Sequence, residues 1–378
     1  MFKQNFGLRI LPYIFLFAFI NSDTIGQTTL TGNLMHNGVN RNYRLRLPKD
    51  HTTDEKIPLV FNMHGFTSNA IQQELYSGMN AVADVERFAV CYPNGVGNAW
   101  NVGWAFGSTA DDVGFISLLI DDLISKYGFN QNKVYACGMS NGGFMSYKLA
   151  CELSNKIAAI ASVTGSMVPG ATAQCNPNNL VPIMEIHGTA DNTVAYNGTP
   201  FISTAIPEIL KFWQDKNECD VAPQIEMIPN SNTTDNTTTE KQTYINCRNN
   251  KEVVHYKVLG GGHTWPGASI STGATSQDFN ASATIWEFFN RYSLENTSNV
   301  LNTDTNQRSI ILNNPASDYI NIRHFSENQN LKMYNLQGQL SLATQLNSGE
   351  NIIQIGHLES GMYFIKIENQ PTLKFIKI

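Results

Sequence analysis

The sequence predicts an α/β domain, with a mostly parallel sheet covered by helices on both faces, followed by a small all-β sandwich. Short, almost continuously apolar runs alternate with amphipathic segments as far as residue 292, a pattern typical of strands that are buried on both faces. A polar, aperiodic stretch at 293–307 then precedes short alternating strands in residues 308–378, which favours a β-sandwich. The chain is therefore expected to contain two domains joined by a linker.

The N-terminal residues and the charge balance indicate an exported protein that does not bind nucleic acid. Residues 1–26 have the pattern of a signal peptide, with Lys3 and Arg9 before an apolar stretch at 10–20 and small residues before position 27. We expect the first domain to span 27–292. No later stretch approaches the length of a transmembrane helix. The 25 Lys and Arg and the 31 Asp and Glu give a net charge of −6, and the basic residues form no run that could follow phosphates.

The elements of the first domain are predicted from apolar periodicity and turn residues. A hairpin is expected at 28–47, because Asn37-Gly38 is a favoured two-residue turn between paired strands. Buried strands are predicted at 58–64, 88–92, 133–137, 157–163, 181–187 and 253–258, and helices at 70–85, 112–127, 141–153, 206–216 and 281–292. The Asn- and Thr-rich segment 230–243 is interpreted as an insertion without a function.

A serine lies on a tight turn between a predicted strand and a predicted helix. Gly138-Met139-Ser140-Asn141-Gly142 has the form Gly-x-Ser-x-Gly, in which side chains at the two glycine positions would collide with neighbouring backbone. Such a turn exposes Ser140 Oγ, and the helix that follows directs its free N–H groups toward the place where an oxyanion would form. The motif in this context predicts that Ser140 is the nucleophile of an acyl transfer.

Ser140 needs a base that takes its proton and an acid that orients the base, and both should follow it in the sequence. Downstream histidines are His187, His255, His263, His324 and His357. His263 follows a glycine-rich loop directly after a predicted strand and is the expected base, the alternative being a structural or exposed histidine. Asp191 follows the preceding buried strand and is the expected acid, the alternative being that it only caps a turn. His187 is expected to end its strand by hydrogen-bonding locally.

Two backbone N–H groups should hold the oxyanion. One belongs to Asn141, directly after the nucleophile, and the second is expected from the loop after the strand that ends at His64, where Phe66 is the candidate. His64 is interpreted as a structural residue of this loop. Because the chain has no His-Glu-x-x-His motif and its cysteines lack the spacing of metal ligands, we expect neither a metal nor a cofactor.

The six cysteines can be interpreted as disulfide candidates because the protein is expected to be exported. Cys151 and Cys175 flank one segment, and Cys219 and Cys247 flank another, so these are the two expected pairs. The remaining two, at positions 91 and 137, lie in apolar strand-like runs and are expected to be buried free thiols.

Five motifs in order carry a resemblance to a known family. They are His64-Gly65, Asp111-Asp112-Val113-Gly114-Phe115, Gly138-Met139-Ser140-Asn141-Gly142-Gly143, His187-Gly188-Thr189-Ala190-Asp191 and Gly261-Gly262-His263-Thr264-Trp265-Pro266-Gly267. Over residues 30–292 the chain resembles the secreted polyhydroxybutyrate depolymerase and feruloyl esterase group of α/β-hydrolases, akin to carbohydrate esterase family 1. The resemblance implies an α/β-hydrolase fold and a triad of Ser140, Asp191 and His263.

The same resemblance implies a tryptophan near the active site that contacts the substrate. Trp265 is the first candidate, the alternative being that it only packs the loop of His263, and Trp100 and Trp104 are further candidates. Members often carry Cys or Tyr after His-Gly, whereas this chain has Phe66, so a disulfide in the oxyanion loop is not implied.

The C-terminal residues 308–378 resemble a type A sorting domain of the type IX secretion system. The resemblance rests on Asn314-Pro315-Ala316-Ser317-Asp318-Tyr319, Tyr334-Asn335-Leu336-Gln337-Gly338, Ser360-Gly361-Met362-Tyr363 and the terminal stretch 374–378. It implies the secretion machinery as a partner and an extracellular or surface location. The alternative is a carbohydrate-binding module, which usually exposes aromatic side chains on one face.

The sequence thus predicts an exported serine esterase, and feruloyl esters of plant cell-wall polysaccharide are the expected substrates. A polyhydroxyalkanoate or acetylated xylan is an alternative substrate. An alternative of another class is a non-catalytic, polysaccharide-binding surface protein built on a hydrolase scaffold.

Overall fold

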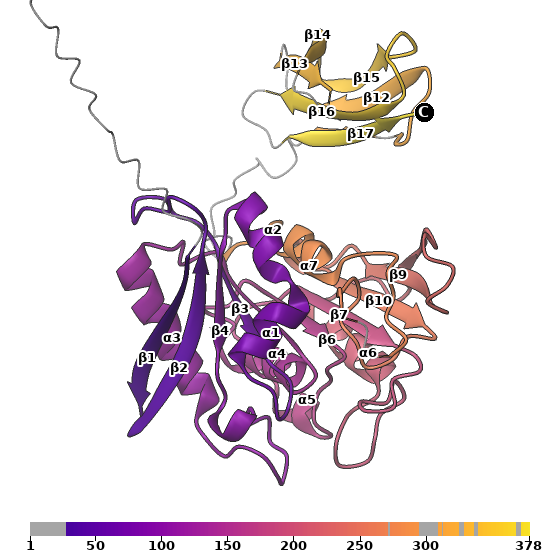
Figure 1. Cartoon of the computed structure of the whole chain (residues 1–378). Coiled ribbons are helices and arrows are strands. Elements are labelled where there is room, and N and C mark those ends of the chain that lie inside the picture. Colours follow the sequence, from indigo (N-terminus) through magenta and orange to yellow (C-terminus); the bar gives the residue numbers. More distant parts are fainter. Residues whose placement is uncertain are drawn as a thin grey trace, which may run out of the picture. The chain divides into compact units, whose positions relative to one another are not determined.

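The computed structural model describes residues 28–270, 273–294, 309–311, 313–324, 329–335, 339–367 and 372–378. The expected signal peptide at 1–26 and most of the expected linker at 293–307 lie outside these residues. The chain divides into two compact units, Met1–Thr297 and Ser298–Ile378 (Figure 1).

The first unit is built on a ten-stranded sheet with the strand order β1-β2-β4-β3-β5-β6-β7-β10-β9-β8. The strands are β1 (Thr28–His36), β2 (Val39–Leu47), β3 (Leu59–Met63), β4 (Ala89–Pro93), β5 (Val134–Met139), β6 (Ala159–Val163), β7 (Ile183–Gly188), β8 (Gln224–Ile228), β9 (Thr238–Tyr244) and β10 (Val253–Leu259). The strands from β4 to β10 in this order are parallel, and antiparallel pairs complete both edges. Loops that follow the parallel strands therefore meet along one edge of the sheet.

Helices cover both faces of this sheet (Figure 1). They are α1 (Ala70–Ser77), α2 (Met79–Glu86), α3 (Asp112–Tyr127), α4 (Asn141–Glu152), α5 (Ala171–Gln174), α6 (Ile206–Lys216) and α7 (Ala281–Phe289), with short 3₁₀ turns at Val96–Asn98 and Arg248–Asn250. Because successive side chains of a strand point to opposite faces, Phe61 of β3 packs in the core with α3, α4 and α6, while Val60 packs in the core with α2 and α7. This arrangement confirms the predicted fold class.

Two predicted segments differ from the structure. The helix expected at 70–85 is broken at Gly78, whose φ of 61° ends α1 before α2 begins. The interpretation of 230–243 as an insertion is wrong, because Thr238–Tyr244 forms β9 and pairs with β10. On its other side β9 pairs with β8, which is the edge strand of the sheet. The side chains of β8 are mostly exposed, so this strand lacks the apolar run on which the other strand predictions rested.

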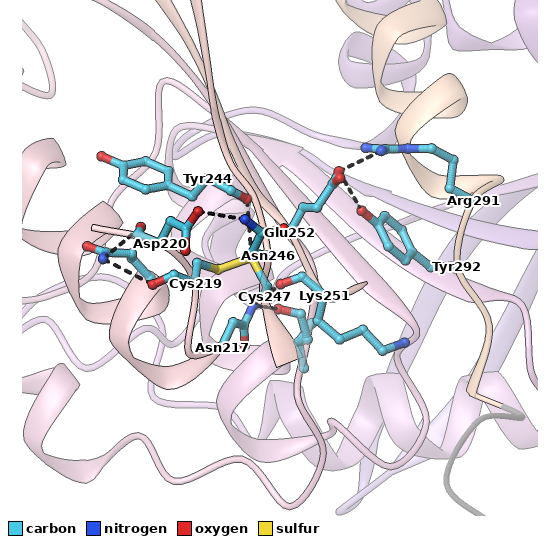
Figure 2. The surroundings of a disulfide bond; sticks show 12 residues. Asn217, Cys219, Asp220, Tyr244, Asn246, Cys247, Lys251, Glu252, Arg291 and Tyr292 are labelled. Atoms are coloured by element: carbon cyan, nitrogen blue, oxygen red, sulfur yellow. Dashed lines mark hydrogen bonds and ion pairs between the residues drawn. A yellow bond between two sulfur atoms is a disulfide. The ribbon is translucent and has the colours of Figure 1, made fainter. Parts of the chain in front are cut away.

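The structure contains both expected disulfide bonds. Cys151 in α4 is joined to Cys175 after α5, and Cys219 after α6 is joined to Cys247 between β9 and β10. Figure 2 shows the second bond, beside which Asn246 Nδ2 donates to Asp220 Oδ2 at 2.7 Å. The cysteines at positions 91 and 137 are free and buried, as predicted.

The second unit consists of two packed sheets, as the sequence predicts. One sheet has the order β11-β12-β15 and the other has the order β14-β13-β16-β17. Their strands are β11 (Ile310–Ile311), β12 (Tyr319–His324), β13 (Gln329–Tyr334), β14 (Leu340–Leu346), β15 (Gly349–Gln354), β16 (Gly361–Ile367) and β17 (Leu373–Lys377). Ile322 from the first sheet and Met333 from the second are fully buried in one core, in which the rings of Tyr363 and Phe375 stack. In the described part of the chain, no helix has both the length and the apolar character needed to cross a bilayer.

Candidate active site

The turn between β5 and α4 holds Ser140 in a strained backbone conformation. Its φ of 54° and ψ of −121° lie where residues other than glycine are rare. The neighbouring glycines are required by space, since a Cβ on Gly142 would lie 2.1 Å from the carbonyl oxygen of Met63, and one on Gly138 would lie 2.6 Å from the same atom. The turn therefore has the geometry of a nucleophile elbow, with Ser140 at the N-terminus of α4.

Asp191 and His263 are in direct contact. His263 Nδ1 lies 2.7 Å from Asp191 Oδ2, while Asp191 Oδ1 accepts hydrogen bonds from the backbone N–H groups of Thr193 and Val194, both at 2.8 Å. Burial alone would raise the pKa of Asp191, but the hydrogen bonds from His263 and Val194 outweigh it and lower this pKa below its ordinary value. Because the carboxylate accepts from Nδ1, the Nε2 atom of His263 is left with the lone pair that a general base needs.

Backbone contacts between two loops bring this pair together. The loop after β7 carries Asp191 and the loop after β10 carries His263, and β7 pairs directly with β10. Ala190 N donates to Gly261 O at 2.9 Å, and a Cβ on Gly188 would lie 2.2 Å from the same carbonyl oxygen. Ser140 follows β5, which is separated from β7 only by β6, so all three expected triad residues lie at the same edge of the sheet.

The loop after β3 lies against the nucleophile. A Cβ on Gly65 would lie 3.4 Å from the Cβ of Ser140. His64 Nε2 accepts from the Gly95 backbone N–H at 3.0 Å, and Nδ1 lies 2.7 Å from the Gly65 carbonyl oxygen, so the ring is neutral with its proton on Nδ1. Burial is the main cause that lowers the pKa of His64 to about 4. His64 is therefore a structural residue, as predicted, and the oxyanion roles of Asn141 and Phe66 stay predictions.

The side chain of Asn141 has a role that the sequence did not suggest. Its Oδ1 accepts from the Trp100 backbone N–H at 2.7 Å, and its Nδ2 lies 3.3 Å from the Trp100 carbonyl oxygen. This buried amide ties the elbow to the loop between β4 and α3. The far end of that loop is held by Asp112, which accepts from Arg41 Nη2 at 2.6 Å. The loop is thus fixed at both sides of its exposed tip.

Two of the three tryptophans that are candidates for contact with the substrate are buried in the structure. Trp100 and Trp265 are each only 1% exposed, with the indole N–H groups donating to His64 O and Ser282 Oγ. Neither ring presents a face to a substrate, and Trp265 fits the alternative that it packs the loop of His263. For the half-buried Trp104, whose indole N–H donates to Ile202 O at 2.8 Å, substrate contact stays a prediction.

Trp104 and Phe106, at the tip of the loop between β4 and α3, pack against Phe66 of the loop after β3. We call Phe66, Trp104 and Phe106 the aromatic patch. Trp104 and Phe106 stack with centroids 5.1 Å apart, and Phe66 lies edge-on to both, at 6.4 Å and 5.9 Å. Phe66 is 41% and Phe106 47% exposed. The sequence analysis did not single out Phe106. Its place two residues after Trp104 in a glycine-rich loop is the signal that could have indicated an exposed ring there.

Behind the acid lies a buried pair on β7. His187 Nδ1 lies 2.9 Å from Glu185 Oε1, and Nε2 lies 2.8 Å from the Val194 carbonyl oxygen. His187 therefore bonds locally, as the sequence predicts, and its partner Glu185, two residues earlier on the same strand, is a residue that the sequence analysis did not single out. Among the described residues, no group of three or more His, Cys, Asp or Glu side chains is placed to hold a metal ion.

Comparisons with known proteins agree with this architecture. Residues 311–378 match the family described as secretion system C-terminal sorting domain, and residues 108–231 match the phospholipase/carboxylesterase family. NocK of Nocardia uniformis subsp. tsuyamanensis, which is named as an esterase, is 30% identical over 288 residues, or 69% of this chain and 82% of NocK.

Feruloyl esterase B of Piromyces equi is 31% identical over 235 residues, which cover 58% of this chain and 42% of that protein. The chain thus spans less than half the length of this relative. The solved structure of an acetyl xylan esterase from Aspergillus awamori matches with a TM-score of 0.51 and 17% identity, over 69% of this chain and 99% of that chain. At this identity the match shows a shared fold.

Proposed function

Because the chain belongs to the phospholipase/carboxylesterase family of α/β-hydrolases and is a carboxylic ester hydrolase, we propose that it cleaves feruloyl esters of plant cell-wall polysaccharide. Its C-terminal sorting domain directs it through the type IX secretion system to the cell surface or the medium. The protein thus interacts with the secretion machinery during export, and its ester substrate lies outside the cell.

The mechanism that we propose uses Ser140, His263 and Asp191 as a triad. Ser140 Oγ attacks the ester carbonyl carbon while His263 Nε2 takes the hydroxyl proton, and His263 then gives that proton to the leaving alcohol oxygen. Water, deprotonated by His263 Nε2, then attacks the acyl-serine carbonyl carbon, and His263 returns this proton to Ser140 Oγ as the bond from that oxygen to the acyl carbon breaks, which releases the acid and the free enzyme. The strained elbow and the His263–Asp191 contact of 2.7 Å support this assignment.

The oxyanion of each tetrahedral intermediate would be held by backbone N–H groups. Asn141 is the first residue of α4, so its N–H has no partner within the helix. The second donor is the N–H of Phe66, in the loop whose Gly65 lies against Ser140. One such donor contributes about 3 kcal/mol to stabilising the transition state in related chemistry.

The preference for a feruloyl group rests on the aromatic patch. Its two exposed rings are Phe66, in the loop that is expected to hold the oxyanion, and Phe106, which packs edge-on against Phe66. An aromatic acyl group can stack on these rings or meet them edge-on, an interaction worth about 0.5–1.5 kcal/mol for each pair beyond buried area. An acetyl or a hydroxybutyrate group has no ring with which to make this contact. The name of the Piromyces equi relative, a feruloyl esterase, is consistent with this substrate class.

The test compares three substrates and four proteins. Ferulate release from methyl ferulate and feruloylated arabinoxylan, and hydrolysis of a nitrophenyl acetate, are measured with the wild type, Ser140→Ala, Phe106→Ala and Tyr319→Ala. Tyr319 is 47% exposed, like Phe106, and lies in the second unit, so it is the matched control. We expect kcat/KM for methyl ferulate to fall about 5-fold in Phe106→Ala, from roughly 1 kcal/mol of lost ring contact, and to stay unchanged in Tyr319→Ala.

Three results would contradict parts of this proposal. Equal hydrolysis by Ser140→Ala and the wild type would reject the serine mechanism. Hydrolysis of the nitrophenyl ester without release of ferulate would reject the substrate and direct the search to acetylated xylan and polyhydroxyalkanoate. Polysaccharide binding without turnover of any ester would support the non-catalytic alternative.

A further inference from the structure

We propose that the buried pair Glu185–His187 positions the catalytic acid. The pair holds the Asp191 carboxylate in the orientation in which it accepts the hydrogen bond from His263 Nδ1. This inference rests on the triad of the proposed function. It adds two positioning residues that touch neither the substrate nor the reacting atoms.

The pair is enclosed by the structure and fixed by it. Glu185 and His187 are two residues apart on β7, so both point to the same face of the sheet, and both are fully buried. Tyr147 donates its hydroxyl hydrogen to Glu185 Oε2 at 2.8 Å. Because Tyr147 lies in α4, the helix that begins after Ser140, Glu185 connects the nucleophile's helix to the strand that leads to Asp191.

The hydrogen-bond partners define where the protons are. A carbonyl oxygen can only accept, so the Val194 carbonyl at 2.8 Å requires a proton on His187 Nε2. A second proton lies between His187 Nδ1 and Glu185 Oε1, and with it the pair is neutral in sum. Both carboxylate oxygens and both ring nitrogens therefore have partners, as buried polar groups require.

His187 acts on Asp191 through Val194. The Val194 carbonyl accepts from His187, and the Val194 N–H donates to Asp191 Oδ1 at 2.8 Å. His187 Nε2 also lies 3.5 Å from Asp191 Oδ2, the oxygen that receives His263. A shift of Val194 would therefore turn the carboxylate, and a misplacement of about 1 Å can reduce a rate by about 100-fold.

The other groups that face His187 hold it in place. The ring of Tyr196 meets the His187 ring edge-on, with centroids 6.0 Å apart. The Tyr196 hydroxyl donates to Nε2 of a second buried histidine, His255, at 3.0 Å, and His255 Nδ1 donates to the Glu185 carbonyl oxygen at 3.0 Å. If Glu185 and His187 only filled space, two apolar residues could replace them at a smaller cost of desolvation. Apolar residues could not donate a hydrogen bond to the Val194 carbonyl oxygen, as His187 does.

Two substitutions of the same residue separate positioning from packing. In His187→Gln the amide nitrogen can occupy the place of Nε2 and donate to Val194, whereas in His187→Asn the shorter amide reaches only the place of Nδ1 and the contact with Val194 is lost. Both remove the ring, so both carry a similar loss of packing. We expect kcat for nitrophenyl acetate to be at least 10-fold lower in His187→Asn than in His187→Gln, with equal KM and similar unfolding midpoints.

Equal kcat values for the two folded variants would overturn the inference, and so would a difference that lies in KM alone. If His187→Asn does not fold, Tyr147→Phe tests the same chain of contacts, because it frees Glu185 Oε2 and keeps the ring. A folded Tyr147→Phe with wild-type kcat would also overturn the inference, whereas a several-fold lower kcat at unchanged KM supports it. Ser140→Ala separates the two proposals: if it retains full activity, the triad fails, whereas an inactive Ser140→Ala with equal His187 variants rejects only the positioning role.

Discussion

Acidification is expected to destabilise the catalytic domain through His64. This histidine is fully buried, and its neutral form is required because Nε2 accepts the Gly95 N–H and Nδ1 donates to Gly65. A proton on Nε2 would place two donors against each other. Folding therefore lowers the pKa of His64 from 6.5 to about 4, and the stability of the folded state is linked to pH in this interval.

The sign and size follow from the two pKa values. Above pH 6.5 His64 is neutral in both states and the full stability is present. Below it the unfolded chain binds a proton that the folded protein does not, so stability falls with pH until about pH 4, where the folded form is protonated as well. One pKa unit corresponds to about 1.4 kcal/mol, which gives a loss of about 2 kcal/mol at pH 5.

The variant His64→Gln isolates this contribution. Its amide oxygen can accept from Gly95, and it does not titrate. We expect the free energy of unfolding of the wild type, minus that of the variant, to decrease by about 2 kcal/mol between pH 7 and pH 5. The wild type is compared with the variant because His255 also contributes a loss of stability in acid: burial lowers its pKa to about 3. This loss is similar in both proteins, so it cancels when the two unfolding free energies are subtracted.

Guanidinium unfolding followed by tryptophan fluorescence measures this quantity. All five tryptophans of the chain, at positions 100, 104, 213, 265 and 286, lie in the first unit, so the signal reports the catalytic domain. The denaturant slope must be the same for both proteins at both pH values. A difference in unfolding free energy that does not change between pH 7 and pH 5 would refute the argument that His64 is held neutral.

Three further predictions concern single contacts. Arg41→Met removes one partner of a buried ion pair and leaves the Asp112 carboxylate unpaired, so guanidinium unfolding should show a loss of about 3–5 kcal/mol, and a loss below about 1 kcal/mol would contradict the pairing. Replacing Cys219 and Cys247 together with Ser opens a loop of 28 residues, which should cost up to about 3.6 kcal/mol in the same assay, while unchanged stability would show that the bond does not form. Gly142→Ala places a Cβ 2.1 Å from a carbonyl oxygen of β3, so we expect at least a 100-fold loss of kcat for nitrophenyl acetate, and wild-type activity would disprove the tight elbow.

The elements with a strong local signal could be predicted from the sequence. The helices Asp112–Tyr127 and Ile206–Lys216 begin and end where they were predicted, because apolar periodicity and the C-terminal Gly128 or the N-terminal proline define them locally. The strand Gln224–Ile228 was not predicted, since it has no continuous apolar run and its side chains are mostly exposed, and in the structure it pairs with β9.

The candidate site shows the same division. Ser140, Asp191 and His263 could be named as candidates for a triad because this fold sets the order of such residues and places each of them on a loop after a strand. The buried Trp265 could not be told from an exposed one, because burial depends on α7, whose Ser282 accepts its indole N–H. The contacts between the loops, such as those of Asn141 with Trp100 and of Ala190 with Gly261, depend on which strands are neighbours in the sheet. They could therefore be found only in the structure.

The polar groups buried beneath the candidate active site suggest why the stability of the domain should respond to acid before the geometry of the site does. His64 and His187 donate to backbone carbonyl oxygens of the loops after β3 and β7, and Arg41 donates to the carbonyl oxygen of Asn94 and to Asp112 at the two ends of the loop between β4 and α3. Apolar residues in these places would avoid the cost of desolvation but could not fix the direction of a loop. In the folded protein His64 is protonated only near pH 4, where the contact with Gly95 is lost, and Gly95 lies at the start of the loop that carries Trp104 and Phe106 of the aromatic patch. A fall in pH should therefore first lower the stability of the domain, from pH 6.5 downward, and should loosen this loop only near pH 4.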